Sequence, residues 1–260
     1  MPLLSRVRSM ILLLLMVAIG FPVVARELSC GIALGFPPYQ YRDGSQEAGF
    51  DADVARLVMA RLAHRCRFVQ EPWDQILNQL RYGKLDLVVG MEINAQREKY
   101  FDFTTPYMAR QSVIFVNAQT SRVQRIDELF GQFIAGDRSS KIEQLWQEQG
   151  IRTRFRIREL DSKSAAMAFL KSGRVQAAIM PLEVGIYLAR EHQLTVRALA
   201  EPRVDTPVAI AVKKGNQALR QQLDGAVREL IASGEIAALY QRWFGVPFEA
   251  AASQSPRRGH

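Results

Sequence analysis

The chain has 260 residues, enough for one large domain or two small ones, and its 48% hydrophobic and 23% charged residues are ordinary for a folded soluble protein. Beyond residues 1–25 no run is long and apolar enough to span a bilayer as a helix. The formal net charge of +8 could suit anionic ligands or membrane surfaces, but we interpret it as the general basicity of an exported protein.

Residues 1–25 are typical of a secretory signal peptide. Two arginines precede an apolar run over 10–21, small residues follow, and cleavage is expected after Ala25. A lipid anchor at Cys30 is rejected, because Glu27 puts a charge where such a signal needs an apolar side chain. The sequence therefore predicts a periplasmic protein.

Strands and helices alternate after this leader. Short apolar segments rich in β-branched residues predict strands, and apolar residues at helical spacing predict helices with one buried face. The predicted strands are 28–34, 65–69 and 85–89, and the predicted helices are 51–64 and 74–82. This β-α-β-α-β order begins a doubly wound, mainly parallel sheet.

A second α/β pattern follows. The predicted elements are a loop over 101–107, a strand over 111–116, a polar connector over 117–125, strands over 130–135 and 175–180, and helices over 141–149, 162–172 and 182–192. A strand over 207–213 then returns as the partner of 111–116. It is followed by an amphipathic helix over 217–233, a short last helix, and a tail over 250–260 that we expect to be disordered.

Together these patterns predict an α/β protein with two lobes. The first lobe would comprise 26–116 and 208–249, and the second 117–207, each with a doubly wound, mainly parallel sheet. Two crossings between the lobes imply a hinge, and a cleft where both sheets present their strand ends.

The segment 90–99 carries the strongest binding signal. Gly90 is expected to end the preceding strand, Asn94 can cap a helical turn, and Arg97 lies one turn in, able to hold a carboxylate with two parallel hydrogen bonds. Oriented N–H groups and a guanidinium at the carboxyl end of a parallel strand would form an anion clamp. The alternative is that Arg97 merely pairs with a nearby carboxylate such as Glu98.

Cys30 and Cys66 are the only cysteines. An even count in an oxidising compartment permits one disulfide, and both residues fall in strands that we predict to be parallel neighbours. We expect them to be bonded; two free thiols are the alternative.

Several short segments form a family pattern that spans nearly all of the mature chain in order. They are Pro38-Tyr39-Gln40-Tyr41, Gly49-Phe50-Asp51-Ala52-Asp53, Trp73-Asp74, Gly83-Lys84-Leu85-Asp86, Gly90 to Arg97, Phe103-Thr104-Thr105-Pro106-Tyr107, Gly173-Arg174-Val175, Ala211-Val212-Lys213-Lys214-Gly215 and Tyr240-Gln241-Arg242-Trp243-Phe244-Gly245. The pattern resembles the type II periplasmic solute-binding proteins, amino-acid-binding branch (family 3). The resemblance implies a monomeric venus-flytrap protein, without a cofactor, that delivers a small carboxylate-bearing solute to an ABC importer.

The same resemblance implies roles for individual residues. Arg97 would grip the ligand's α-carboxylate, helped by the backbone around Gly90 and Glu92, while Phe36 and Trp73 would stack on the ligand. The expected ligand-binding residues are Phe36, Tyr39, Trp73, Gly90, Met91, Glu92, Arg97, Ser140 and Lys141. The aromatic rings of this set could instead simply cover the core.

Three positions depart from the family pattern. Glu92 stands where Ser or Thr is usual, Lys141 where Thr is usual, and Pro181 where an Asp usually holds the ligand's ammonium group. Either Glu92 replaces that missing acid, which suits a polar amino acid, or Glu92 and Lys141 pair across the lobes and the ligand has no amine. We favour the first arrangement.

The family resemblance also allows two other functions. The same scaffold hosts a periplasmic prephenate-type dehydratase, for which Glu92 would be a general acid. It also hosts the ligand-sensing lobes of membrane receptors, so a soluble partner of a receptor is the other alternative. The three histidines are scattered without metal-ligand spacing, and no P-loop or dinucleotide motif occurs.

Four arginines alternate in one short stretch, Arg152, Arg154, Arg156 and Arg158. On a strand they would share one face. We interpret this stripe as a solvated face; a docking surface for an acidic partner or lipid headgroups is the alternative. Nucleic acid is not expected as a partner, because no aromatic residues interleave on that face.

Overall fold

The computed structural model describes residues 25–136, 140–245 and 248. Residues 1–24 of the proposed leader, the tail over 250–260 that the sequence predicts to be disordered, and residues 137–139 lie outside this range. The helices are α2 (Phe50–Arg61), α3 (Trp73–Arg81), α4 (Lys141–Glu148), α5 (Lys163–Lys171), α6 (Leu182–Glu191), α7 (Gln217–Ala232) and α8 (Glu235–Phe244). The strands are β1 (Glu27–Ala33), β2 (Tyr41–Asp43), β3 (Gln46–Ala48), β4 (Arg65–Glu71), β5 (Leu87–Glu92), β6 (Phe101–Phe103), β7 (Met108–Asn117), β8 (Phe133–Gly136), β9 (Arg156–Glu159), β10 (Ala177–Pro181), β11 (Val196–Ala198) and β12 (Val204–Lys213). Short 3-10 turns are η2 (Arg97–Lys99), η3 (Ile126–Leu129) and η4 (Arg152–Arg154).

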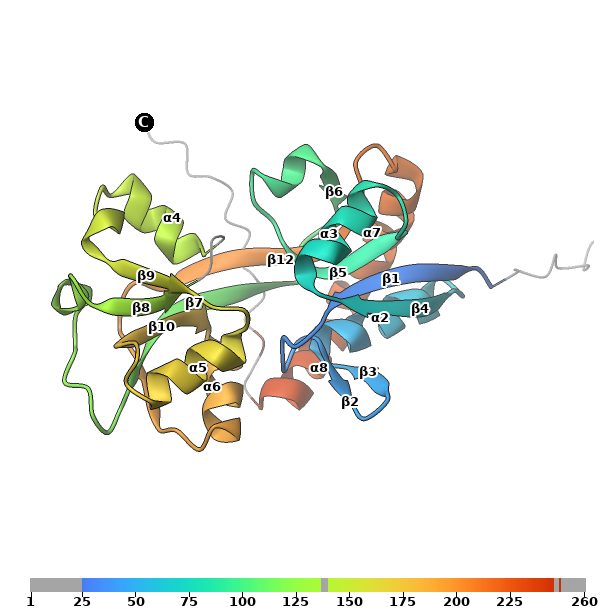
Figure 1. Ribbon diagram of the computed structural model, residues 1–260. Coiled ribbons are helices and arrows are strands. Elements are labelled where there is room, and N and C mark those ends of the chain that lie inside the picture. Colours follow the sequence, from blue (N-terminus) through green and yellow to red (C-terminus); the bar gives the residue numbers. More distant parts are fainter. Residues whose placement is uncertain (1–24, 137–139, 246–247, 249–260) are drawn as a thin grey trace, which may run out of the picture.

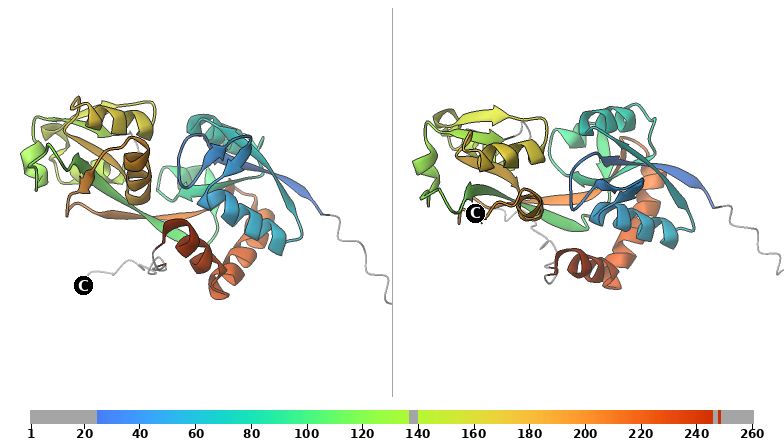
Figure 2. Two further views of the ribbon diagram at one scale, coloured as in Figure 1. Left: turned by 90° about the horizontal axis from the view of Figure 1, so that it is seen from below. Right: turned by 60° about the horizontal axis from the view of Figure 1, so that its bottom comes forward.

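Two α/β lobes lie on either side of the long strands β7 and β12 (Figure 1). The first lobe holds β1, β4 and β5 with α2, α3, α7 and α8, and the second holds β8 to β11 with α4, α5 and α6. Figure 2 shows the same separation from two further directions, with β7 and β12 running between the lobes. The two-lobed α/β fold agrees with the prediction, while the residue boundaries at 116/117 and 207/208 stay a prediction.

A single continuous sheet runs through both lobes, in the order β4-β1-β5-β12-β7-β10-β8-β9. β1 is parallel to β4 and β5, and β8 is parallel to β9 and β10, as a doubly wound pattern requires. The crossing strands are antiparallel to their neighbours: residues 204–208 of β12 pair with 108–112 of β7. The crossings thereby join two parallel sheets into one, and they place β5 beside the crossing strand β12.

Burial of apolar faces holds each lobe together. The helix α3 is amphipathic, and its Ile76 and Leu80 pack with Val88 and Met91 of β5 in one buried cluster. In the second lobe Trp146 of α4 stacks on Phe155, with ring centroids 3.9 Å apart. Each such side chain stabilises the fold by roughly 1.5–3 kcal/mol through removal of apolar surface from water.

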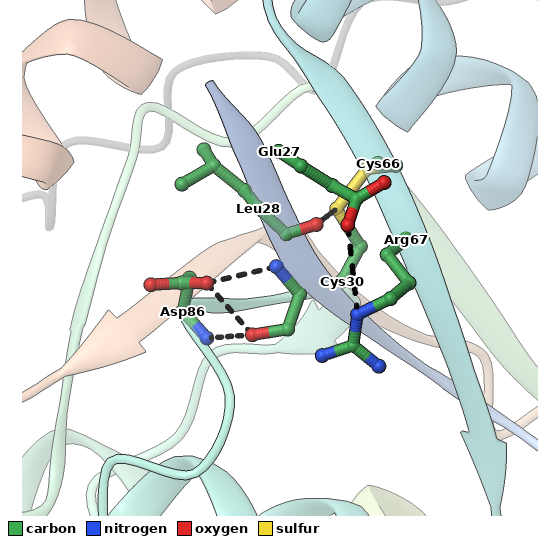
Figure 3. Close-up of a disulfide and its surroundings, with 7 residues drawn as sticks. Glu27, Leu28, Cys30, Cys66, Arg67 and Asp86 are labelled. Carbon is green, nitrogen blue, oxygen red and sulfur yellow. Dashed lines mark hydrogen bonds and ion pairs between the residues drawn. A yellow bond between two sulfur atoms is a disulfide. The ribbon is translucent and has the colours of Figure 1, made fainter.

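The expected disulfide between Cys30 and Cys66 is present (Figure 3). It joins β1 to β4, with the two Cα atoms 5.6 Å apart. On the other side of β1, Asp86 accepts hydrogen bonds from the backbone N–H and the hydroxyl of Ser29, at 2.8 and 2.7 Å. The N-terminal strand is thus fixed from both sides.

The prediction that Gly90 ends its strand is wrong. β5 continues through Gly90 to Glu92, and Gly90 sits in a bulge: Ala209 of β12 pairs with Met91, whereas Ala211 pairs with Val88. Gly90 has φ +75°, and a Cβ there would lie 2.1 Å from a carboxylate oxygen of Asp51. Glycine is required here by both the backbone conformation and the packing. In a single sequence, a glycine in a bulge looks the same as a glycine that ends a strand.

Two further expectations need correction. The loop predicted over 101–107 begins with β6, which pairs with the end of β12 because Phe101 is buried in the first-lobe core. The arginine stripe does not lie on one strand: Arg152 belongs to the turn η4 and pairs with Glu143 at 2.9 Å, while Arg156 belongs to β9. The hairpin of β2 and β3 and the strand β11 were not predicted.

Candidate functional site

Arg97 is held by its own segment. The backbone N–H of Arg97 donates to the side chain of Asn94 at 2.9 Å, but the 3-10 turn η2 starts only at Arg97 and its N-cap residue is Gln96, not the predicted Asn94. The Arg97 guanidinium donates to the carbonyl of Glu92 at 2.7 Å and lies 5.4 Å from the ring centroid of Trp73. These contacts orient the guanidinium beside the end of β5 and beside a half-buried aromatic ring.

A second arginine, Arg110 of β7, was not among the predicted site residues. Its side chain is 3% exposed, and it forms an ion pair with Asp51 at the start of α2, which is fully buried. It also donates to the carbonyl of Gly90 at 2.9 Å, and one of its terminal nitrogens lies 3.8 Å from a carboxylate oxygen of Glu92. Arg110 therefore connects a crossing strand to the end of β5.

Aromatic rings cover the same guanidinium. Its central carbon lies 4.3 Å from the ring centroid of Tyr39 and 5.2 Å from that of Phe36. Stacked arrangements of this kind favour a cation, more so when water is excluded. The contacts of Arg110 and Arg97 join Trp73, Glu92 and Phe36 into one continuous cluster.

Asp51 forms several hydrogen bonds and an ion pair inside the protein. Besides Arg110 it accepts hydrogen bonds from Gln40 at 2.6 Å and from the hydroxyl of Tyr107 at 2.7 Å. A buried carboxylate is tolerated only when it is paired and hydrogen-bonded in this way. The network explains why an aspartate can stand among the apolar first residues of α2.

The buried network also shifts its titrating groups. Burial alone would lower the pKa of Arg110, but the carboxylates of Asp51 and Glu92 outweigh it and raise that pKa above its ordinary value. Burial, together with the carboxylate of Asp51, raises the pKa of Tyr107 well above its ordinary value. Burial, followed by the charge of Glu183, does the same to the pKa of Tyr39. Arg110 is therefore charged, and both phenols are neutral, at physiological pH.

The second lobe contributes α4 and α6. Ser140 caps α4 by accepting from the backbone N–H of Glu143 at 3.4 Å, and Lys141 opens the helix. Pro181 is the last residue of β10, and Glu183 follows two residues later in the first turn of α6. Among the contacts between described residues, no hydrogen bond or ion pair joins Ser140 or Lys141 to the first-lobe cluster.

Glu183 connects the lobes elsewhere. Its carboxylate accepts from the hydroxyl of Tyr39 at 2.8 Å and from that of Tyr240 in α8 at 3.2 Å. One carboxylate of the second lobe is thereby bound to two phenols of the first. Tyr41 and Tyr187 add a ring contact across the same boundary, at 6.2 Å between centroids.

The structure therefore brings together most of the predicted ligand-binding residues. The connected set comprises Phe36, Tyr39, Trp73, Gly90, Met91, Glu92 and Arg97. Tyr39 and Met91 are fully buried, so a ligand contact at Met91 would come from its backbone, and Tyr39 acts on the cluster through Arg110. Glu92 is 23% exposed, and no described residue donates a hydrogen bond to its carboxylate.

Arg110 could have been found from the sequence by one signal. It shares with the buried Met108 the inward face of a strand whose other residues are largely apolar. A charged residue at an inward position needs a buried partner, and Asp51 lies among the buried residues that open α2.

Within residues 25–136 and 140–245, no group of acidic, histidine or cysteine side chains could hold a metal ion. In the same ranges, no helix has the length and apolar character to cross a bilayer.

Comparison with known proteins gives consistent matches. Residues 28–246 match the family model of bacterial extracellular solute-binding proteins, family 3. The ABC transporter arginine-binding protein 1 of Escherichia coli is 26% identical, and the alignment covers 85% of this chain and 91% of that protein.

Solved structures match over a similar range. An ancestral arginine-binding protein bound to glutamine has a TM-score of 0.75 at 29% identity, over 85% of this chain and 98% of its own. An ancestral amino acid-binding protein, described as a precursor of cyclohexadienyl dehydratase, has a TM-score of 0.74 at 26% identity, over 84% and 95% of the two chains.

Proposed function

We propose that this chain, which belongs to family 3 of the bacterial extracellular solute-binding proteins, binds an amino acid in the periplasm and delivers it to an ABC importer. One observation carries the proposal: at the end of β5 the guanidinium of Arg97 donates to the carbonyl of Glu92 and lies 5.4 Å from the ring centroid of Trp73, and the Glu92 carboxylate lies 3.8 Å from the guanidinium of Arg110. A cation and an anion five residues apart match the two charges of an amino acid. Arg97 would take the α-carboxylate and Glu92 the ammonium group.

The surroundings of Glu92 support this assignment over a pairing with Lys141. The ion-pair partner of Glu92 in the structure is Arg110 of its own lobe, at 3.8 Å, and not Lys141. That separation is too long for a hydrogen bond, so the oxygens of Glu92 can still accept from a ligand. Lys141 would then face the ligand's distal end or the solvent.

The names of relatives support an amino acid as the solute. The Escherichia coli relative is named as arginine-binding, and the ancestral relative is an arginine-binding protein described as bound to glutamine. Phe36, Trp73 and the backbone around Gly90 would complete the first-lobe side, and Ser140 and Lys141 the second-lobe side. Transport partners and the periplasmic location follow from the family in the same way.

The dehydratase alternative would use Glu92 as a general acid. The relative described as a dehydratase precursor is itself named as an amino acid-binding protein. We therefore propose a binding role without catalysis.

Thermal shift measurements with the standard L-amino acids and L-cystine test the proposal. We expect at least one to raise the melting temperature, because a ligand that binds only the folded state stabilises it. In parallel, formation of phenylpyruvate from prephenate is measured. No stabilising amino acid, or turnover of prephenate, would contradict the binding role.

A further inference from the structure

The carboxylates around the candidate site differ in how many hydrogen bonds and ion pairs they form with other residues of the protein. Asp51 has three partners in the buried network, and Glu183 accepts from two phenols. Glu92 accepts no hydrogen bond from any residue within the described ranges, yet it is 77% covered. Glu92 is thus the acid that can still accept hydrogen bonds from a ligand's ammonium group. To do so selectively, its carboxylate needs a neighbouring group that holds it in place.

Arg110 is the group in contact with the Glu92 carboxylate. Its guanidinium is held rigidly by the Asp51 carboxylate, the carbonyl of Gly90 and the ring of Tyr39. Its Nε is buried and has no hydrogen-bond partner among the described residues. So constrained a cation, 3.8 Å from Glu92, restricts where that carboxylate can lie.

We propose that Arg110 is a positioning residue that holds Glu92 toward the ligand's ammonium group and thereby makes the site select amino acids over their deaminated analogues. The inference rests on the proposed function, because it assigns the ligand's amine to Glu92. Arg110 does not touch the ligand; it acts through Glu92.

Charge balance explains how Arg110 can hold Glu92 without cancelling its attraction for a cation. The positive charge of Arg110 is offset by Asp51, with which it forms the closer ion pair. Glu92 therefore keeps a net negative charge at the site, and Arg97 supplies the positive one.

The decisive variant removes Arg110 without changing the net charge. In Arg110→Met with Asp51→Asn, both members of the buried pair become neutral, so the net charge of the site is unchanged, while the contact of Arg110 with Glu92 is lost together with its hydrogen bond to the Gly90 carbonyl. A second variant, Arg110→Lys, keeps the pair with Asp51 but loses the planar, forked guanidinium that contacts Glu92, and it serves if the double variant does not fold.

Calorimetry gives the affinity of each variant for two probes. For L-arginine the deaminated probe is 5-guanidinopentanoate; if the thermal shift panel selects L-glutamine, its deaminated probe is glutaramate. We expect the wild type to prefer the amine-bearing probe, and the double variant and Arg110→Lys to lose about tenfold of that preference. Glu92→Gln should remove most of the preference in the wild type and little more in the double variant.

The outcomes separate the two ideas. If the variants lower the affinity for both probes equally and leave the preference intact, Arg110 is only structural and the inference is overturned. If Glu92→Gln in the wild type leaves the preference intact, the assignment of the amine to Glu92 fails, and with it the proposed arrangement. A wild type that binds no amino acid overturns the proposed function and the inference together.

Discussion

At the scale of single residues, two arginines near the end of β5 have different surroundings. Arg97 lies half-buried on a short turn, and its guanidinium donates to the Glu92 carbonyl. Arg110 is 3% exposed and is paired with a fully buried carboxylate. Under the proposed function the first meets the ligand's carboxylate, and the second positions Glu92.

Replacing Arg97 by Ala should abolish amino-acid binding while the fold survives. The change removes a charge-assisted bidentate contact to the ligand, at a cost of about 2–5 kcal/mol in binding free energy. Calorimetry measures it, and Lys99→Ala is the matched control, because Lys99 is an exposed cation of the same turn. Near-normal affinity in Arg97→Ala would mean that the residue is structural.

Replacing Arg110 alone should destabilise the protein more than replacing it together with Asp51. In Arg110→Met the buried carboxylate loses its cation, which costs roughly 3–5 kcal/mol of unfolding free energy. In the double variant with Asp51→Asn the stranded charge is gone, so part of that loss should be recovered. Urea unfolding of both variants checks the order, and equal losses would mean that the pair is not coupled.

At the scale of elements, the short strand β6 is tied to the turn before α7 through Asp102. Its carboxylate accepts from the backbone N–H of Gly215 at 2.8 Å and from Gln217 at 2.7 Å, and it pairs with Lys214 at 2.9 Å. Burial alone would raise the pKa of Asp102, but these donors and the Lys214 charge outweigh it and lower that pKa.

This lowered pKa predicts a pH-dependent contribution to stability. A carboxyl group with a folded-state pKa below its unfolded value, about 4, stabilises the fold above that pH and loses the effect as the pH falls through the folded-state pKa. Asp102→Asn should therefore be less stable than the wild type at pH 7, and the gap should close below about pH 4. Unfolding at a series of pH values tests this, with the exposed Asp161→Asn as control; a gap independent of pH would be inconsistent with it.

The disulfide is the other fixed point between elements. It closes a loop with a sequence separation of 36 between Cys30 and Cys66. Loop-closure entropy predicts that replacing both cysteines by Ser lowers the unfolding free energy by about 4 kcal/mol. Denaturant unfolding of the double variant, compared with reduced wild type, measures the loss; an unchanged midpoint would show that β1 and β4 need no cross-link.

At the scale of the whole molecule, β7 and β12 join the lobes, and the hydrogen bonds of Glu183 to Tyr39 and Tyr240 cross the same boundary. A ligand held by both lobes would favour conformations in which they are closer together. Arg110 belongs to the crossing strand β7 and contacts Glu92, so it connects the candidate site to the segment that joins the lobes.

Ligand binding should therefore make the molecule more compact. Small-angle X-ray scattering with a stabilising amino acid should give a smaller radius of gyration than the ligand-free protein, without a change in oligomeric state. Arg97→Ala with the same amino acid is the control and should not respond. An unchanged radius in the wild type would contradict hinge closure.

The sequence by itself predicted the two-lobed α/β fold and the segment that holds Arg97, and it favoured a bond between Cys30 and Cys66 over two free thiols. These predictions rest on periodicity, cysteine count and local polar residues, which are visible in the chain without any knowledge of its tertiary contacts. Tertiary structure alone decided that Gly90 lies in a bulge and that Arg110 meets Asp51, which is 59 residues away in sequence. It also decided that Glu183 is bound to two phenols, one of them 144 residues away. Such contacts depend on how the two lobes pack around the crossing strands, and that packing has no local signature in the chain.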